Sequence, residues 1–217
     1  MTTDELRESL LAGPKNGFTK LTAEQREEME AYAKRYMAFM DAAKTEREAT
    51  TWAIVEAEKL GFKPFVPGMD AKPGDKIYYN NRNKAIALAV IGTESLAHGA
   101  NICAAHVDSP RIDLKPNPLF EDAEIAFFKT HYYGGIKKYQ WTAIPLALHG
   151  VVCLKDGSSV TVTIGEDDND PILMVSDLLP HLAADQMQKP AGRIIEGEQL
   201  NVILGTEPLE GEGAELV

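Results

Sequence analysis

Residues 84–92 read KAIALAVIG and are almost wholly apolar. A short apolar run bounded by polar residues is typical of a strand that is buried on both faces of a sheet. Residues 76–80 form a second predicted strand, and the polar NNRN turn joins the two. ANICAAHV at 100–107 is another apolar run that ends abruptly in polar residues, so we predict a further strand there.

Two capped helices precede these strands. Thr22 with Gln25 and Thr45 with Glu48 have capping-box spacing, in which the two residues satisfy each other's backbone N–H groups. The first helix carries an apolar stripe that predicts one buried face, and Gly61 supplies the stop of the second. Helices followed by buried strands predict an α/β layer with both faces of the sheet covered.

From about residue 114 the sequence changes to short strands separated by turns. The strand-like segments are AEIAFFKTHYY at 123–133, WTAIPLALHGVVCLK at 141–155 and SVTVTIG at 159–165. The Asp156-Gly157 pair between the last two is a strong hairpin signal. This change predicts two domains, residues 1–113 and a β-rich domain at residues 114–217.

The composition excludes several classes of protein. A formal net charge of −11 argues against a nucleic-acid-binding surface and fits a cationic ligand or a divalent metal better. No apolar run reaches the roughly 18 to 20 residues of a membrane span, and the acidic start is unlike a secretion signal, so a cytoplasmic protein that binds no membrane is expected. Cys103 and Cys153 lie in apolar surroundings without CxxC spacing, which predicts buried free thiols.

The densest group of polar residues is AAHVDSPRIDLKP at 104–116. In a strand, residues two apart point the same way, so His106 and Asp108 should project together from the strand's carboxyl end. An imidazole can bind a metal while a neighbouring carboxylate supports it. Spacing alone leaves open a plain hydrogen-bonded pair without a metal.

Three segments resemble landmarks of the aspartyl-aminopeptidase-like family, in the order expected for it. They are AHVDSPRIDLKP at 105–116, THYYGGIKKYQWTAIPLALHGVV at 130–152 and SDLLPHLAADQMQ at 176–188. The resemblance implies a peptidase with two zinc ions per active site, and an α/β catalytic domain interrupted by an inserted β-rich dimerisation domain. It also implies peptide substrates and a homo-oligomer built from dimers, up to a dodecamer.

The resemblance also implies roles for three residues. His106 would be a zinc ligand, and Asp108 the carboxylate that orients a ligand and supports the metal pair, while a glutamate general base assists the attacking water. His181 lies in a part of the inserted domain that can reach a neighbouring subunit's active site in the family, where a histidine can steady an oxyanion. Alternatively the catalytic histidine falls a turn later, where this chain has Asp185, and His181 only begins a helix.

The chain departs from the family pattern in two places. The remaining carboxylate ligands and the second histidine are not found; the acidic cluster at 166–170 reads as a solvated turn, and His131 and His149 as surface or packing residues. We therefore predict a truncated aminopeptidase that is inactive alone. A non-catalytic assembly or binding relative, and a second chain that supplies the missing half, are the alternatives. After Trp141 the sequence lacks the family's acidic and basic pair, which leaves a preference for N-terminal Asp or Glu open.

Overall fold

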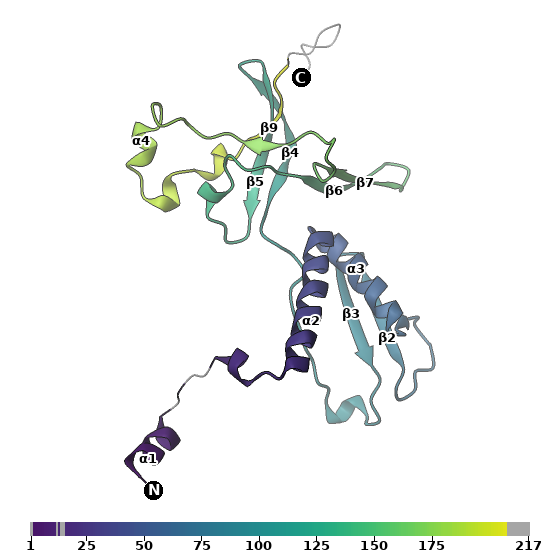
Figure 1. Cartoon of the computed structure of the whole chain (residues 1–217). Helices are drawn as coiled ribbons and strands as arrows, with labels where there is room; N and C mark the ends of the chain where they lie inside the picture. The colour runs from purple at the N-terminus through teal and green to yellow at the C-terminus, as the bar shows by residue number, and fades with distance from the viewer. Residues whose placement is uncertain (1, 12, 14–15, 208–217) are drawn as a thin grey trace. The chain divides into compact units, whose positions relative to one another are not determined.

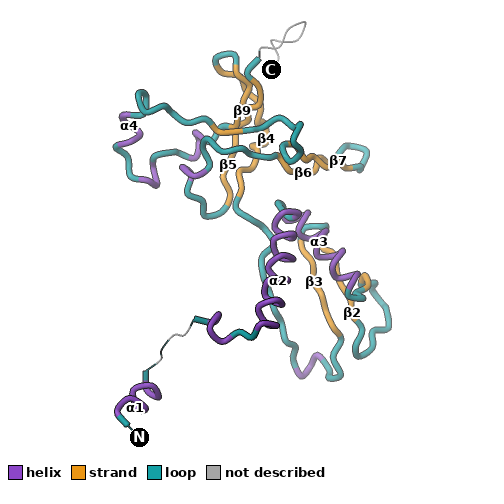
Figure 2. The backbone as a smooth tube through the Cα atoms, viewed as in Figure 1, coloured by secondary structure: helices purple, strands orange, loops and turns teal. Residues whose placement is uncertain are grey.

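The computed structural model describes residues 2–11, 13 and 16–207 and divides into two compact units, residues 1–43 and residues 44–217 (Figure 1). The first unit contains α1 (Thr3–Leu10), a 3₁₀ turn (Gly17–Lys20) and α2 (Ala23–Ala42). All strands belong to the second unit, as the orange segments of Figure 2 show. No helix in the described part of the chain is long and apolar enough to cross a membrane.

Helix α2 begins where the sequence predicts. The hydroxyl of Thr22 accepts a hydrogen bond from the Gln25 backbone N–H, and the Gln25 side chain accepts one from the Thr22 N–H. None of its described residues is buried, so the prediction of a buried face is wrong. The physical reason is that a unit of one long helix and two short helical segments is too small to cover a 20-residue helix.

Helix α3 (Glu46–Lys59) opens the second unit with the predicted capping box of Thr45 and Glu48. Its buried residues are Ala49, Thr50 and Ala57, and this side packs on strands β2 and β3 (Figure 1). The helix ends just before Gly61, whose φ of +86° is the left-handed conformation that glycine adopts without strain.

Strands β1 (Lys63–Pro64), β2 (Lys76–Asn81) and β3 (Ala85–Val90) form a three-stranded sheet in that order. The predicted hairpin is confirmed: β2 and β3 are antiparallel. Arg82 and Asn83, which both have positive φ, are the central residues of a turn in which the Lys84 N–H donates to the Asn81 carbonyl oxygen. The prediction that β3 is buried on both faces is wrong. It is the sheet's edge strand, and Leu88 and Val90 are 49% and 60% exposed.

Residues 100–107 do not form the predicted strand. They belong to a stretch without helix or strand, and Ile102 is 87% exposed. An apolar run becomes a strand only when a neighbouring strand supplies partners for its N–H and C=O groups, and no such neighbour pairs with it within the described residues.

The prediction that both cysteines are buried is wrong. Cys103 lies in this unpaired stretch and Cys153 at the end of a two-stranded ribbon, so neither has a layer to cover it, and both are exposed.

The β-rich part contains a four-stranded sheet and a separate hairpin. The sheet has the order β4 (Arg111–Asp122), β5 (Ile125–Tyr133), β9 (Val202–Gly205) and β8 (Met174–Val175). The hairpin joins β6 (Leu148–Cys153) to β7 (Ser159–Ile164) through the Asp156-Gly157 turn, as predicted. The change in sequence pattern at residue 114 falls inside β4. The division into one domain that ends at residue 113 and another that begins at residue 114 stays a prediction.

One small core stabilises this β-rich part. It consists of Leu173, Val175, Ile195, Leu200 and Val202, with Phe128 and Tyr132 among the side chains packed around it. Residues 190–200 form no strand, but they contain short 3₁₀ turns and contribute two of these core residues. The mixed α/β fold class predicted from the sequence is confirmed.

Thr130 fastens that irregular segment to β5. Its side chain is buried, and its hydroxyl donates a hydrogen bond to the Leu200 carbonyl oxygen. Thr130→Val keeps the shape but leaves the carbonyl without that donor, so we expect the free energy of unfolding to fall by about 1–3 kcal/mol. Urea unfolding measures the loss. Thr161→Val, on an exposed strand position, is the control and should change stability little; an equal loss in both variants would contradict the assignment.

Candidate functional site

His106 and Asp108 lie together in the extended stretch that leads into β4. The His106 ring is 81% exposed, and its Nδ1 atom is 2.9 Å from the Asp108 carbonyl oxygen and 3.3 Å from Asp108 Oδ1. Both oxygens are acceptors, so Nδ1 carries the proton and the lone pair of Nε2 is available to a ligand. The predicted pairing of the two residues therefore holds although the predicted strand does not.

Tyr133, the last residue of β5, holds the other side of the Asp108 carboxylate. The Tyr133 hydroxyl donates a 2.7 Å hydrogen bond to Asp108 Oδ2. This bond is the main reason that the pKa of the Asp108 carboxyl is lowered, with its own backbone N–H and His106 acting in the same direction. The same bond raises the pKa of the Tyr133 phenol, since ionising it would place two negative charges side by side.

Arg111, the first residue of β4, braces Tyr133. Its guanidinium lies 4.3 Å from the centre of the Tyr133 ring, within the range of a cation–π contact. Arg111 Nε also donates to Asp113 Oδ1 at 2.7 Å, and Nη1 donates to the Ser109 carbonyl oxygen at 3.3 Å. Sequence reasoning did not connect Tyr133 or Arg111 with Asp108, because these contacts depend on the pairing of β4 with β5.

The chemistry of this group fits one part of a zinc site. Zinc in proteins takes imidazole nitrogen as a ligand and commonly has a carboxylate or backbone carbonyl holding the ligand's other ring nitrogen. His106 and Asp108 have this arrangement. The described residues contain no cluster of three or more histidine, cysteine, aspartate or glutamate side chains that could enclose a metal, so His106 and Asp108 offer only a share of the ligands.

His181 stands apart from this group. It is exposed, in the turn before the short helix α4 (Ala184–Met187), and within the described residues it makes no hydrogen bond or ion pair with His106 or Asp108. The N-cap of α4 is Ala183, which has no side-chain cap, so His181 does not begin the helix by capping it. Its role at a neighbouring subunit's site stays a prediction.

A second cluster of titratable groups joins α3 to the β6–β7 hairpin. His149 Nδ1 is 2.8 Å from Glu48 Oε1, and His149 Nε2 is 2.8 Å from Glu166 Oε1. Burial lowers the pKa of His149, but the hydrogen bonds and charges of the two carboxylates outweigh it, and the pKa is raised. The sequence predicted a surface or packing residue here; His149 is 13% exposed and is held between two carboxylates, 101 and 17 residues away, that sequence reasoning missed.

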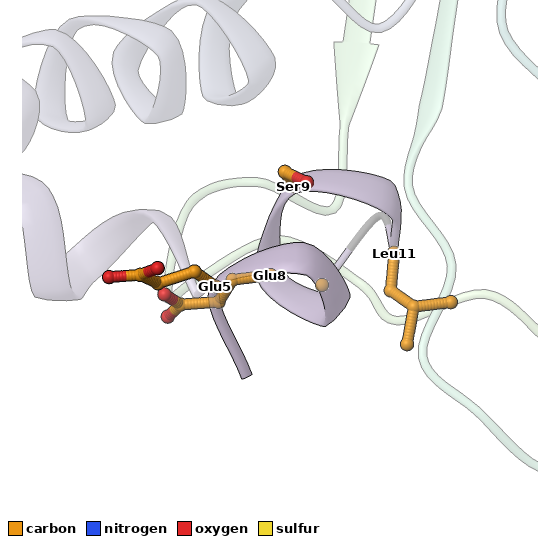
Figure 3. A pocket seen from close by; sticks show the side chains of 5 residues that line it. Glu5, Glu8, Ser9 and Leu11 are labelled. Carbon is orange, nitrogen blue, oxygen red and sulfur yellow. The ribbon is translucent and has the colours of Figure 1, made fainter. Parts of the chain in front are cut away.

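A hollow of about 470 Å³ lies along α1, lined by Glu5, Glu8, Ser9, Leu11 and Gly13 (Figure 3). The labelled side chains do not converge: Ser9 and Leu11 point away from the two glutamates. A ligand site needs polar groups that meet at one point within an apolar concavity. We therefore take His106 and Asp108, and not this hollow, as the candidate functional site.

Comparison with known proteins gives consistent matches. Residues 39–215 match the family described as aminopeptidase I zinc metalloprotease (M18). A probable M18 family aminopeptidase 1 of Clostridium acetobutylicum is 49% identical over 205 residues, which are 93% of this chain and 44% of the relative. A crystal structure of an M18-family aminopeptidase from Thermotoga maritima is 43% identical with a TM-score of 0.83, covering 93% of this chain and 44% of that one.

The match also extends to a more distant structure. The dodecamer of a yeast aminopeptidase is 16% identical, with a TM-score of 0.61 over 82% of this chain and 39% of that one, and shares the fold. The chain thus spans less than half the length of the relatives it matches.

Proposed function

Since this chain belongs to the M18 family of aminopeptidase I zinc metalloproteases, we propose that it forms the N-terminal part of a zinc-dependent aminopeptidase, with His106 as a metal ligand. The observation that supports this is the state of the His106 ring. Its Nδ1 atom lies against Asp108, and the side chain is 81% exposed, which leaves Nε2 without a protein partner among the described residues. A histidine that served only packing would have its ring covered.

The chain's own residues have two tasks in this proposal. Asp108 fixes the ring orientation and proton position of His106, which keeps Nε2 ready to bind. Its low pKa keeps the carboxylate charged, so it can also support a cationic centre. Zinc, when bound, would polarise the scissile carbonyl of a peptide and lower the pKa of a water molecule. Two zinc ions per site and peptide substrates are part of the proposal.

The described residues provide too few ligands for a closed metal site, and the chain covers 44% of its relative. We therefore propose that it is inactive alone and that the ligands completing the site come from the region its relatives have beyond it. The term full-length protein is used below for a polypeptide that contains this chain and extends over the whole length of those relatives.

We also propose that the full-length protein is a homo-oligomer in the cytoplasm. Support for assembly comes from the segment around His181, where large apolar side chains are 54–71% exposed: Leu178, Leu179, Leu182 and Met187. Exposed apolar groups of this density are typical of interfaces. They also favour the second candidate function, a non-catalytic relative whose β-rich part serves assembly.

Metal analysis combined with a peptidase assay tests the proposal. We expect the 217-residue chain to bind zinc weakly and to release no amino acid from peptides. The full-length protein should hold zinc and release N-terminal residues, losing activity with a chelator and regaining it with zinc. Two tightly held zinc ions and turnover in the 217-residue chain would refute its incompleteness; an inactive full-length protein that still assembles would favour the second candidate.

A further inference from the structure

We propose that Tyr133 is a positioning residue that acts on the metal ligand His106 through the carboxylate of Asp108. This inference rests on the metal role of His106 proposed above. It adds a residue of the β-rich part to a group that sequence reasoning confined to the stretch before β4.

The two carboxylate oxygens of Asp108 have different partners. Oδ2 accepts the Tyr133 hydroxyl at 2.7 Å, while Oδ1 lies 3.3 Å from His106 Nδ1. The carboxylate is thereby held from both sides. Without the hydroxyl, the partly exposed Asp108 side chain could rotate about its Cβ–Cγ bond and draw Oδ1 away from the imidazole.

Tyr133 is itself held in place by the sheet and by Arg111. Tyr133 is the direct partner of Arg111 in the β4–β5 ladder, so the backbone of the sheet fixes its place. The guanidinium of Arg111 covers the ring at 4.3 Å and is in turn held by Asp113 at 2.7 Å. The backbone pairing and the contact with Arg111 fix the Tyr133 phenol, and the ion pair with Asp113 fixes Arg111. A side chain held in this way can orient a carboxylate more precisely than a mobile one can.

A tight turn at Gly134 follows Tyr133. Gly134 has a φ of +83°, and a Cβ atom at this position would come within 3.3 Å of the Pro110 Cα atom. The chain after Tyr133 therefore lies directly against the Ser109-Pro110 step after Asp108. This close backbone contact joins the HVDSP and YYGG segments and places the Tyr133 hydroxyl within hydrogen-bonding distance of Asp108.

The test uses the 217-residue chain and zinc chloride as the probe. Binding is followed through the NMR signals of the His106 ring, which report a dissociation constant even when binding is weak. Tyr133→Phe removes the hydroxyl but keeps the ring beside Arg111. Tyr139→Phe is the matched control, since the Tyr139 hydroxyl makes no hydrogen bond within the described part of the chain. Asp108→Asn and the double variant Asp108→Asn with Tyr133→Phe complete a double-mutant cycle.

We expect Asp108→Asn to weaken zinc binding by about 10-fold or more, as loss of an outer partner of a metal ligand usually does. Tyr133→Phe should weaken it by about 3- to 10-fold, because the carboxylate remains but is less well oriented. In the Asp108→Asn background the second substitution should cost nothing further. An unchanged affinity in Tyr133→Phe, or an equal loss in both backgrounds, would refute the inference.

A metal-free measurement separates this inference from the proposed function. The carboxyl carbon signal of Asp108 should shift in Tyr133→Phe and stay in place in Tyr139→Phe, with both variants melting at the temperature of the wild type. An unshifted signal would refute the contact itself. A shifted signal in a chain whose His106 never responds to zinc would keep the contact but refute the metal role, and with it the positioning role of Tyr133.

Discussion

Replacing His106 with alanine in the full-length protein should lower aminopeptidase turnover by about 1,000-fold or more and leave the oligomer intact. A metal centre supplies several kcal/mol of stabilisation to the transition state, and each 1.4 kcal/mol corresponds to a factor of ten in rate. The ring is 81% exposed and belongs to no packed core, so the protein should lose metal without losing its fold. Zinc content, turnover and the sedimentation coefficient are the three measurements.

His98→Ala is the matched control for this substitution. His98 is also an exposed histidine close to an acidic residue, with Nδ1 3.3 Å from Glu94 Oε2. Exposed pairs of this kind contribute little, so zinc content and turnover should stay at the wild-type level. Retained turnover in His106→Ala would remove His106 from the site, and an equal loss in both variants would show a general sensitivity of the fold.

Replacing His149 with alanine should lower the free energy of unfolding by about 1–3 kcal/mol near pH 5.5. The loss of two charge-assisted hydrogen bonds at 2.8 Å is the cause. His149 is only 13% exposed, but Glu48 and Glu166 are 27% and 46% exposed, so the effect should be smaller than for a fully buried pair. Glu48 keeps its hydrogen bonds from Thr45, so the substitution does not leave its carboxylate without a donor.

The stabilisation from His149 should depend on pH. Because the folded-state pKa of His149 is raised, its contribution is complete below its ordinary value of 6.5 and is lost as pH rises through the folded-state pKa. The pKa of Glu48 is lowered, despite the opposing effect of its burial, by His149 and Thr45. Its contribution is present above 4.5 and is lost as pH falls through the folded-state pKa. The difference between wild type and His149→Ala should therefore be largest from pH 4.5 to 6.5.

Urea unfolding of the 217-residue chain at pH 5.5 and pH 8.5 measures this dependence. His149→Gln is the informative companion, because an amide can donate to a carboxylate but does not titrate. It should retain part of the stability and show a flatter pH profile than the wild type. A wild-type chain whose stability differs from that of His149→Ala by the same amount at both pH values would refute the ionic link.

Several elements were predictable because their causes are local. The capping boxes of Thr22 and Thr45 need only residues three positions apart, and both helices begin at these residues. The two hairpin turns contain Asn83 and Gly157, residue types that tolerate the positive φ found at both positions. The resemblance to a known family also needed only local sequence, because the three landmark segments can be recognised without any knowledge of contacts.

Burial and strand pairing were predicted poorly because they depend on what lies alongside. Residues 85–90 and 100–107 have the composition of covered strands, yet β3 is an edge strand and residues 100–107 have no partner strand in the described chain. An apolar sequence states that a segment can be buried. Whether it is buried depends on other elements of the fold.

The amino-acid order alone was enough for the helix starts and the tight turns, and it indicated that His106 and Asp108 lie side by side. Three-dimensional packing added the partners: Tyr133 on Asp108, Arg111 on Tyr133, and Glu48 and Glu166 on His149. The physical reason is range. Backbone conformation is governed by neighbours a few residues away, whereas a hydrogen bond between side chains 25 or 101 residues apart exists only after the chain has folded.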